Sequence, residues 1–215
     1  MRAAVLVALA ACTVPPPFHV LETTETLQAR KVSFTAGGGG GGGNHLNDCC
    51  AGAAARVRVG IGNRQEVGVD GELIGSKDTI IGGIKLAYKN SPTDGVAIVA
   101  GPGVMVGGDT GDRTAVGGDV GAIVSSRAGT RMQLYAALRG SVAVPVRSDV
   151  YALGGVSEAL VLPIGLAVPL GPTVRLLGEL GGIGSLSQAR DGRTMDVESH
   201  SAVGWYGALA LTFTP

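Results

Sequence analysis

Apolar residues alternate with polar or small residues along most of this chain, and this two-residue period restricts the folds open to it. The pattern is clearest near the end, where every second residue from 203 to 213 is apolar or glycine. Successive side chains of a β-strand point to opposite faces, so the period indicates strands with one apolar face each. The face in question holds Val203, Trp205, Gly207, Leu209, Leu211 and Phe213.

Ten segments of the chain show this period, and none of them favours a helix. The 37 glycines are spread through the periodic segments, and each would cost a helix interior about 1 kcal/mol. We therefore expect an all-β chain. The predicted strands lie near residues 27–36, 53–61, 65–74, 79–89, 95–107, 114–126, 131–146, 157–169, 173–187 and 200–213.

The connections between these segments differ in length in a regular way. Those after even-numbered strands are short and those after odd-numbered strands tend to be longer, whereas Greek-key sandwiches mix lengths at both ends. This asymmetry is typical of outer-membrane barrels, and we expect a closed antiparallel up-and-down transmembrane β-barrel of about ten strands. The short connections are residues 62–64, 90–94, 127–130 and 170–172, and the longer ones are 37–52, 75–78, 108–113, 147–156 and 188–199.

The composition agrees with strands that face an apolar environment. Hydrophobic residues make up 45% of the chain and charged residues only 16%, where about a quarter is usual for soluble domains. Beyond the first dozen residues, no apolar run approaches the ~20 residues of a membrane-spanning helix. The net charge is zero and no basic stripe is present, so nucleic acid is not an expected partner.

The first twelve residues predict export. Met1-Arg2 is a short basic region, residues 3–9 are apolar, and Leu-Ala-Ala-Cys ending at Cys12 resembles the lipobox of bacterial lipoproteins. The resemblance implies cleavage before Cys12 and acylation of that residue. An ordinary secretory signal peptide that contains a cysteine is the alternative.

The expected domain organisation follows from these two signals. Residues 1–11 form the signal peptide. Residues 12–26, which include three consecutive prolines, are expected to form a lipidated, flexible periplasmic tether. Residues 27–215 are expected to form the barrel domain.

The last predicted strand resembles the terminal strand of bacterial outer-membrane barrels. Residues 204–213 read GWYGALALTF, although Thr214 and Pro215 follow the terminal aromatic Phe213. The resemblance implies a place in the outer membrane of a Gram-negative bacterium, with its lipids and the barrel assembly machinery as partners. Trp205 and Phe213 share the apolar face and would stand roughly 20 Å apart along the membrane normal, as interface aromatics do.

The remaining cysteines form an adjacent pair, Cys49-Cys50. They follow His45 and Asp48 in a predicted outward loop that includes the seven glycines of residues 37–43. Such ligands suit zinc, but ordering a glycine-rich loop around an ion is entropically expensive. An oxidised vicinal pair in an oxidising compartment is the favoured interpretation. No metal and no cofactor are expected.

The histidines argue against an enzyme. Some outer-membrane barrels hydrolyse lipids or peptides, and such chemistry needs a base beside a nucleophile. Only His19, His45 and His200 are available. Ser199 and Ser201 flank His200, but neighbours on a strand face opposite ways. No catalytic residue is therefore predicted.

The polar face of the strands carries charges of both signs. Hairpin counting around residues 62–64 sets Arg56 opposite Asp70, and counting around residues 128–130 sets Asp119 opposite Arg139. A ten-stranded barrel is narrow, and charges inside it must be paired. The expected inward residues are Arg56, Arg58, Glu66, Asp70, Glu72, Lys85, Lys89, Asp119, Arg131, Gln133, Tyr135, Arg139, Arg175 and Glu179.

Three functional hypotheses remain open from the sequence. The first is a non-catalytic outer-membrane barrel with a structural, adhesive or narrow solute-channel role. The second is a lipid-anchored soluble barrel or sandwich that binds an apolar ligand, and the third is a barrel enzyme acting on lipid or peptide. The first two differ in which face of the strands is apolar, because a soluble barrel is apolar inside and a membrane barrel outside.

Overall fold

The computed structural model describes residues 21–43, 50–75, 80–107, 113–128, 132–147, 157–190 and 197–215. Ten antiparallel strands close into a barrel in which each strand pairs with its neighbours in the chain and β1 pairs with β10. The predicted all-β, ten-stranded closed barrel is confirmed. The strands are β1 Val32–Gly43, β2 Cys50–Gly62, β3 Gln65–Gly75, β4 Ile80–Thr93, β5 Val96–Gly107, β6 Arg113–Ala128, β7 Met132–Arg147, β8 Ser157–Pro169, β9 Val174–Arg190 and β10 Val197–Phe213.

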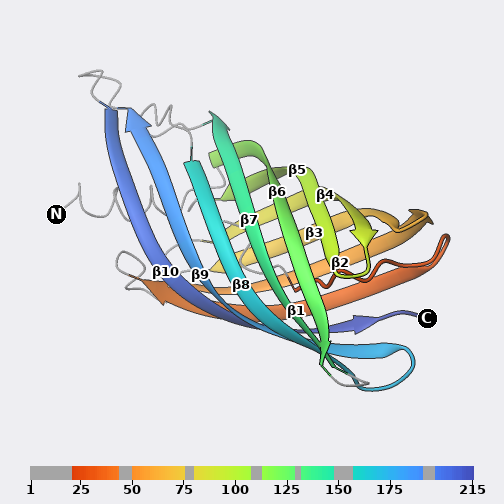
Figure 1. Ribbon diagram of the computed structural model, residues 1–215. Coiled ribbons are helices and arrows are strands. Elements are labelled where there is room, and N and C mark those ends of the chain that lie inside the picture. Colours follow the sequence, from red (N-terminus) through yellow and green to blue (C-terminus); the bar gives the residue numbers. More distant parts are fainter. Residues whose placement is uncertain are drawn as a thin grey trace.

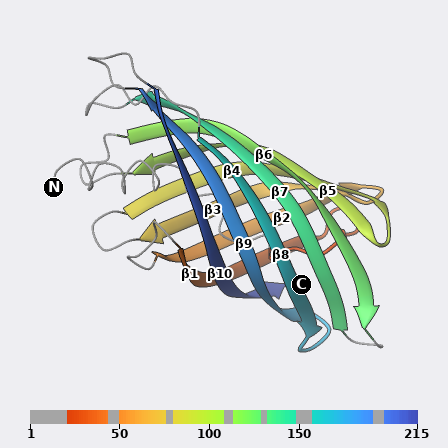
Figure 2. The same ribbon diagram turned by 60° about the vertical axis from the view of Figure 1, so that its left-hand side comes forward.

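The strands cross the barrel obliquely, and β9 lies on the wall opposite β4 (Figures 1 and 2). Connections at one end, here called the turn end, span only residues 63–64, 94–95, 129–131 and 170–173. Those at the other, the loop end, span 44–49, 76–79, 108–112, 148–156 and 191–196. β1 starts and β10 finishes at the turn end, where the C-terminus lies (Figure 1). Within the described residues, no helix is long and apolar enough to cross a membrane.

The two faces of the barrel differ sharply in chemistry. Large apolar side chains cover the outside, where Leu180 is 70% exposed and Trp205 64%. Charged side chains line the inside, where Arg139 is 3% exposed and Glu179 4%. The barrel is thus apolar outside and polar inside, the reverse of the soluble barrel or sandwich that the sequence left open.

The glycine run is a strand, so its expected place in an outward loop is wrong. Residues 37–43 continue β1, which pairs with β10 on one side and with β2 on the other. A Cβ atom added at Gly39 would lie 2.3 Å from the carbonyl oxygen of Gly207, and one at Gly41 would lie 2.3 Å from that of Trp205. Glycine fits this close approach of the strands because it has no Cβ atom. Seven consecutive glycines also show no alternation of apolar and polar residues, so the sequence pattern did not indicate a strand.

The first predicted strand also begins too early, because β1 starts at Val32 and residues 21–27 run through the lumen. Leu21, Glu22 and Thr24 are buried. The chain turns at Arg30, whose φ is 68°, and Arg30 N donates to Gly60 O at 2.8 Å before β1 begins. Residues 21–26 therefore differ from the tether expected for 12–26, while residues 12–20 lie outside the described part of the chain. A polar stretch without periodicity resembles a linker in sequence, but residues 21–27 form hydrogen bonds with strand side chains inside the barrel.

The register of β6 and β7 differs from the expected one by two residues. Asp119 faces Ser141, and Arg139 faces Gly121, because Ala128 pairs with Met132 and the connection lies one residue later than expected. A shift of two keeps every side chain on its face. Between β2 and β3, Arg56 faces Asp70 as expected.

Candidate functional site in the barrel lumen

Residues 21–27, here called the luminal segment, cross the inside of the barrel. At one end, Leu21 N donates a 2.8 Å hydrogen bond to Glu179 Oε2 on β9. Arg56 Nη1 on β2 donates to Leu21 O at 3.2 Å. At the other end, Leu27 N donates to Glu66 Oε1 on β3. Strand side chains thus hold the segment by its main chain, through contacts that do not depend on the identity of its side chains.

Thr24, in the middle of the segment, has partners on several strands and connections. Its hydroxyl donates to Asp94 O at 2.9 Å and contacts Ser125 Oγ on β6. Its carbonyl oxygen accepts a 2.5 Å hydrogen bond from Ser91 Oγ on β4. Lys89 Nζ donates to the next carbonyl, Glu25 O, at 2.5 Å. These contacts fix the segment across the lumen.

Glu22 points into a group of three cations, here called the cation cluster: Arg56, Arg58 and Lys89. Its Oε2 lies 3.7 Å from Arg56 Nη1, and its Oε1 lies 3.5 Å from Arg58 Nε and 3.8 Å from Lys89 Nζ. Burial raises the pKa of Glu22, but the three cations outweigh burial and lower the pKa to about 2. The carboxylate is therefore ionised at neutral pH.

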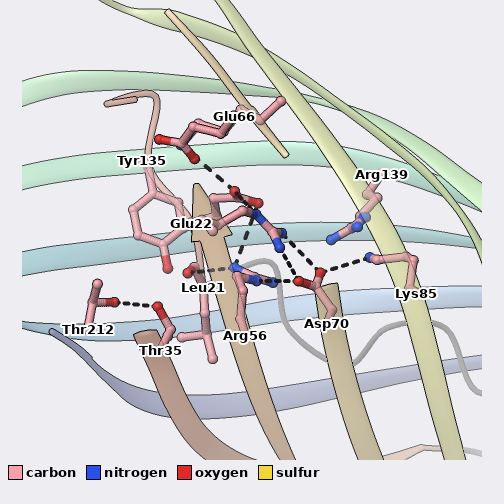
Figure 3. Close-up of polar contacts among 12 residues, drawn as sticks. Leu21, Glu22, Thr35, Arg56, Glu66, Asp70, Lys85, Tyr135, Arg139 and Thr212 are labelled. Carbon is pink, nitrogen blue, oxygen red and sulfur yellow. Dashed lines mark hydrogen bonds and ion pairs between the residues drawn. The ribbon is translucent and has the colours of Figure 1, made fainter. Parts of the chain in front are cut away.

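A chain of ion pairs extends from the cation cluster towards β7. Asp70 Oδ1 accepts from Arg56 Nε at 3.1 Å (Figure 3). Asp70 Oδ2 accepts from Arg58 Nη2 at 3.1 Å. Lys85 Nζ lies 3.4 Å from Asp70 Oδ2 and 3.3 Å from Asp119 Oδ1. Asp119 Oδ2 in turn pairs with Arg139 Nε. The four lumen residues singled out in the sequence, Arg56, Asp70, Asp119 and Arg139, thus belong to one network.

Glu179 forms a second anchor on β9. Its Oε2 accepts from the Tyr135 hydroxyl at 3.0 Å as well as from Leu21 N, and its Oε1 accepts from the Tyr206 hydroxyl at 3.0 Å. The carboxylate therefore joins β7, β9, β10 and the luminal segment.

Two cavities adjoin the luminal segment, and both are lined in part by Leu21, Thr35 and Arg56. The loop-side cavity has a volume of about 80 Å³ and is lined by Asp70, Glu72 and Lys85 together with many glycines and alanines. The turn-side cavity has a volume of about 210 Å³, and the cation cluster lines it together with Glu22.

The other residues predicted from the sequence lie elsewhere. Trp205 and Phe213 are exposed on the outer face of β10. Cys12 and Cys49 lie outside the described residues, and of Cys50 only the main chain, at the start of β2, is described. His200 lies in β10. Among the described residues, no group of three histidine, cysteine or acidic side chains is placed to hold a metal ion.

No protein-family model matches this chain, and no curated protein matches it in sequence. Its backbone is similar to that of several solved barrels. The outer membrane protease OmpT from Escherichia coli has a TM-score of 0.44 at 10% identity, over 90% of this chain and 100% of that chain. The outer membrane protein AlkL has a TM-score of 0.44 at 12% identity, over 94% and 97% of the two chains. The KdgM porin has a TM-score of 0.43 at 8% identity, over 83% and 98%.

Proposed function

We propose that the protein is an outer-membrane barrel of a Gram-negative bacterium. The apolar outer face supports this, because it is suited to contact with lipid. Every strand has at least 11 residues, enough for the ~9–11 that a tilted spanning strand needs. Closure of β1 on β10 pairs the main chain all round, as a non-polar surrounding requires. Membrane lipids and the barrel assembly machinery are its proposed partners.

We further propose that the barrel is a narrow, non-catalytic solute channel held closed by the luminal segment. The observation that carries this is the nature of the closure. The segment is bound mainly by hydrogen bonds and ion pairs, with Leu21 as its contribution to the buried apolar cluster. It takes part in no strand pairing, since the ladders of β1 begin at Val32. Its withdrawal would open a charged, hydrated passage without breaking the barrel.

Planar-bilayer conductance tests the channel proposal. A variant that lacks residues 21–27 should conduct steadily, while the wild-type chain stays mostly closed. A second variant tethers the segment by a disulfide: Thr24→Cys with Ser125→Cys, whose native side-chain oxygens are in contact. Its background has Cys12, Cys49 and Cys50 changed to Ser. The oxidised form should show no openings, and the reduced form should recover the occasional openings of the wild-type chain. A deletion variant that assembles as a heat-modifiable barrel but does not conduct would overturn the channel role and favour a structural or adhesive one.

We also propose cleavage before Cys12 and acylation of that cysteine. The Leu-Ala-Ala-Cys sequence supports the proposal. Metabolic labelling with a fatty acid should mark the wild-type protein and leave Cys12→Ala unmarked. Absence of label on the wild-type protein would overturn the anchor without affecting the channel.

A further inference from the structure

Glu22 fills the cation cluster incompletely. Its carboxylate stays 3.5–3.8 Å from the three cationic nitrogens, longer than the 2.7–2.9 Å usual for charged hydrogen bonds. Within the described residues, neither Glu22 Oε2 nor Arg58 Nε has a hydrogen-bond partner. The side chains of Arg58 and Lys89 are each only 4% exposed. A buried donor without an acceptor is rare, and costly when it occurs.

The carboxylates of the barrel wall do not accept a hydrogen bond from Arg58 Nε, which is therefore available to a third anion. Asp70 accepts from both terminal nitrogens of Arg58, and Glu66 Oε2 lies 3.6 Å from Lys89 Nζ. Two wall carboxylates therefore face the three cations of the cluster, and the direction left over, that of Arg58 Nε, points to Glu22. The position is built for a negatively charged group that the barrel wall does not itself supply.

We propose that the cation cluster is a binding site for a small organic carboxylate, and that Glu22 occupies it as an intramolecular competitor. The occupant seen is itself a carboxylate, with one oxygen directed to Arg56 and the other to Arg58 and Lys89. A free carboxylate is not tied to the main chain of the luminal segment, so it can approach Arg58 Nε more closely than Glu22 does. The turn-side cavity, about 210 Å³ in volume, offers room for a few carbon atoms beside the cluster.

The inference deepens the proposed function and rests on it for its biological setting. In the closed barrel, Glu22 neutralises the cluster. When the luminal segment withdraws, the vacated cations favour the entry of organic-acid anions over neutral solutes of the same size. A carboxylate solute that binds there also hinders the return of Glu22, so the solute itself prolongs the open state.

Chemical rescue of Glu22→Ala with propionate, a free carboxylate with as many carbon atoms as the whole glutamate side chain, tests the site. The readout is the temperature at which the folded, heat-modifiable form is lost. We expect propionate to raise this temperature for Glu22→Ala in a concentration-dependent manner, and the neutral isostere propionamide to have no such effect. Glu25→Ala is the matched control, because Glu25 pairs with the half-exposed Arg175 outside the cluster. Its transition should not respond to propionate.

Adding Arg58→Gln to Glu22→Ala should weaken the apparent propionate affinity at least about tenfold. Lys85→Gln removes a luminal cation that pairs with Asp70 and Asp119, so in the same background it should leave the propionate response largely in place. A Glu22→Ala transition that ignores propionate, or that responds equally to propionamide, would overturn the site. The rescue needs no conduction, so a bound propionate in a barrel that never conducts would refute the channel and retain the site.

Discussion

Arg56 joins the barrel wall to the luminal segment through Glu22 and the residue before it. Its Nη1 lies 3.7 Å from Glu22 Oε2 and donates to Leu21 O at 3.2 Å, while its Nε donates to Asp70 on the neighbouring strand. One guanidinium therefore contacts both the barrel wall and the luminal segment, and loss of this side chain would remove both sets of contacts.

The pair between Asp119 and Arg139 should show strong coupling. Both side chains are 3% exposed, and removal of one partner leaves a buried charge at a cost of about 3–5 kcal/mol. Asp119→Ala should therefore lower the free energy of unfolding more than Asp119→Ala with Arg139→Ala. Urea unfolding in lipid bilayers measures both. The exposed pair Arg64 and Asp94 is the control, and its loss should cost less than about 1 kcal/mol. Additive single changes at 119 and 139 would contradict the coupling.

The side-chain period predicted ten strands and which residues share a face, but not which face points outward. Val203 to Phe213 alternate without a break, and the structure places this apolar face of β10 on the outside. Asp119 and Arg139 meet despite an error of two in their register, because they remain on one face as diagonal neighbours. Where the sequence of a connection does not define its exact length, as at residues 129–131, the register of the two strands can be wrong by two residues.

The luminal segment could not be predicted from periodicity, since an isolated chain inside a barrel has no alternating surroundings. The charges alone gave a signal. The expected inward face held more cations than carboxylates, and the missing acids are Glu22 at the cation cluster and Glu25 at Arg175. The glycines of β1 did not indicate a strand either, because they have no side chains that could alternate between apolar and polar.

The glycine run should tolerate substitution at Gly42 but not at Gly39. Gly39→Ala places a methyl group 2.3 Å from the Gly207 carbonyl oxygen, on the seam between β1 and β10. Gly42→Ala has nothing nearer than the Trp205 side chain at 3.9 Å. We expect Gly39→Ala to reduce the yield of heat-modifiable barrel severalfold and Gly42→Ala to leave it near wild type. Equal yields would show that the seam relaxes around a side chain.

A charged residue on the outer face should destabilise the barrel by an amount that depends on its depth in the membrane. Leu180 lies near the middle of β9 and is 70% exposed, while Leu186 lies nearer its loop end. In lipid, Leu180→Arg should cost about 2–4 kcal/mol and Leu186→Arg a smaller amount, because the cost falls towards the interface. Unfolding in bilayers gives both values. A negligible cost at both positions would mean that this face contacts water, and it would remove the membrane assignment.

Acid should release the luminal segment only at low pH. The pKa of Glu22 is lowered from 4.5 to about 2 by its cationic neighbours. A lowered pKa stabilises the folded state above pH 4.5, and this contribution is lost as the pH falls through about 2. The closed state of the wild-type chain should therefore persist at pH 4 and weaken towards pH 2. In Glu22→Gln the site cannot ionise, so this variant reports the pH response of all other groups. The difference in open probability between the two proteins, measured in bilayers from pH 5 to pH 2, isolates Glu22. A difference that is already lost near pH 4.5 would mean that Arg56, Arg58 and Lys89 do not hold this carboxylate ionised.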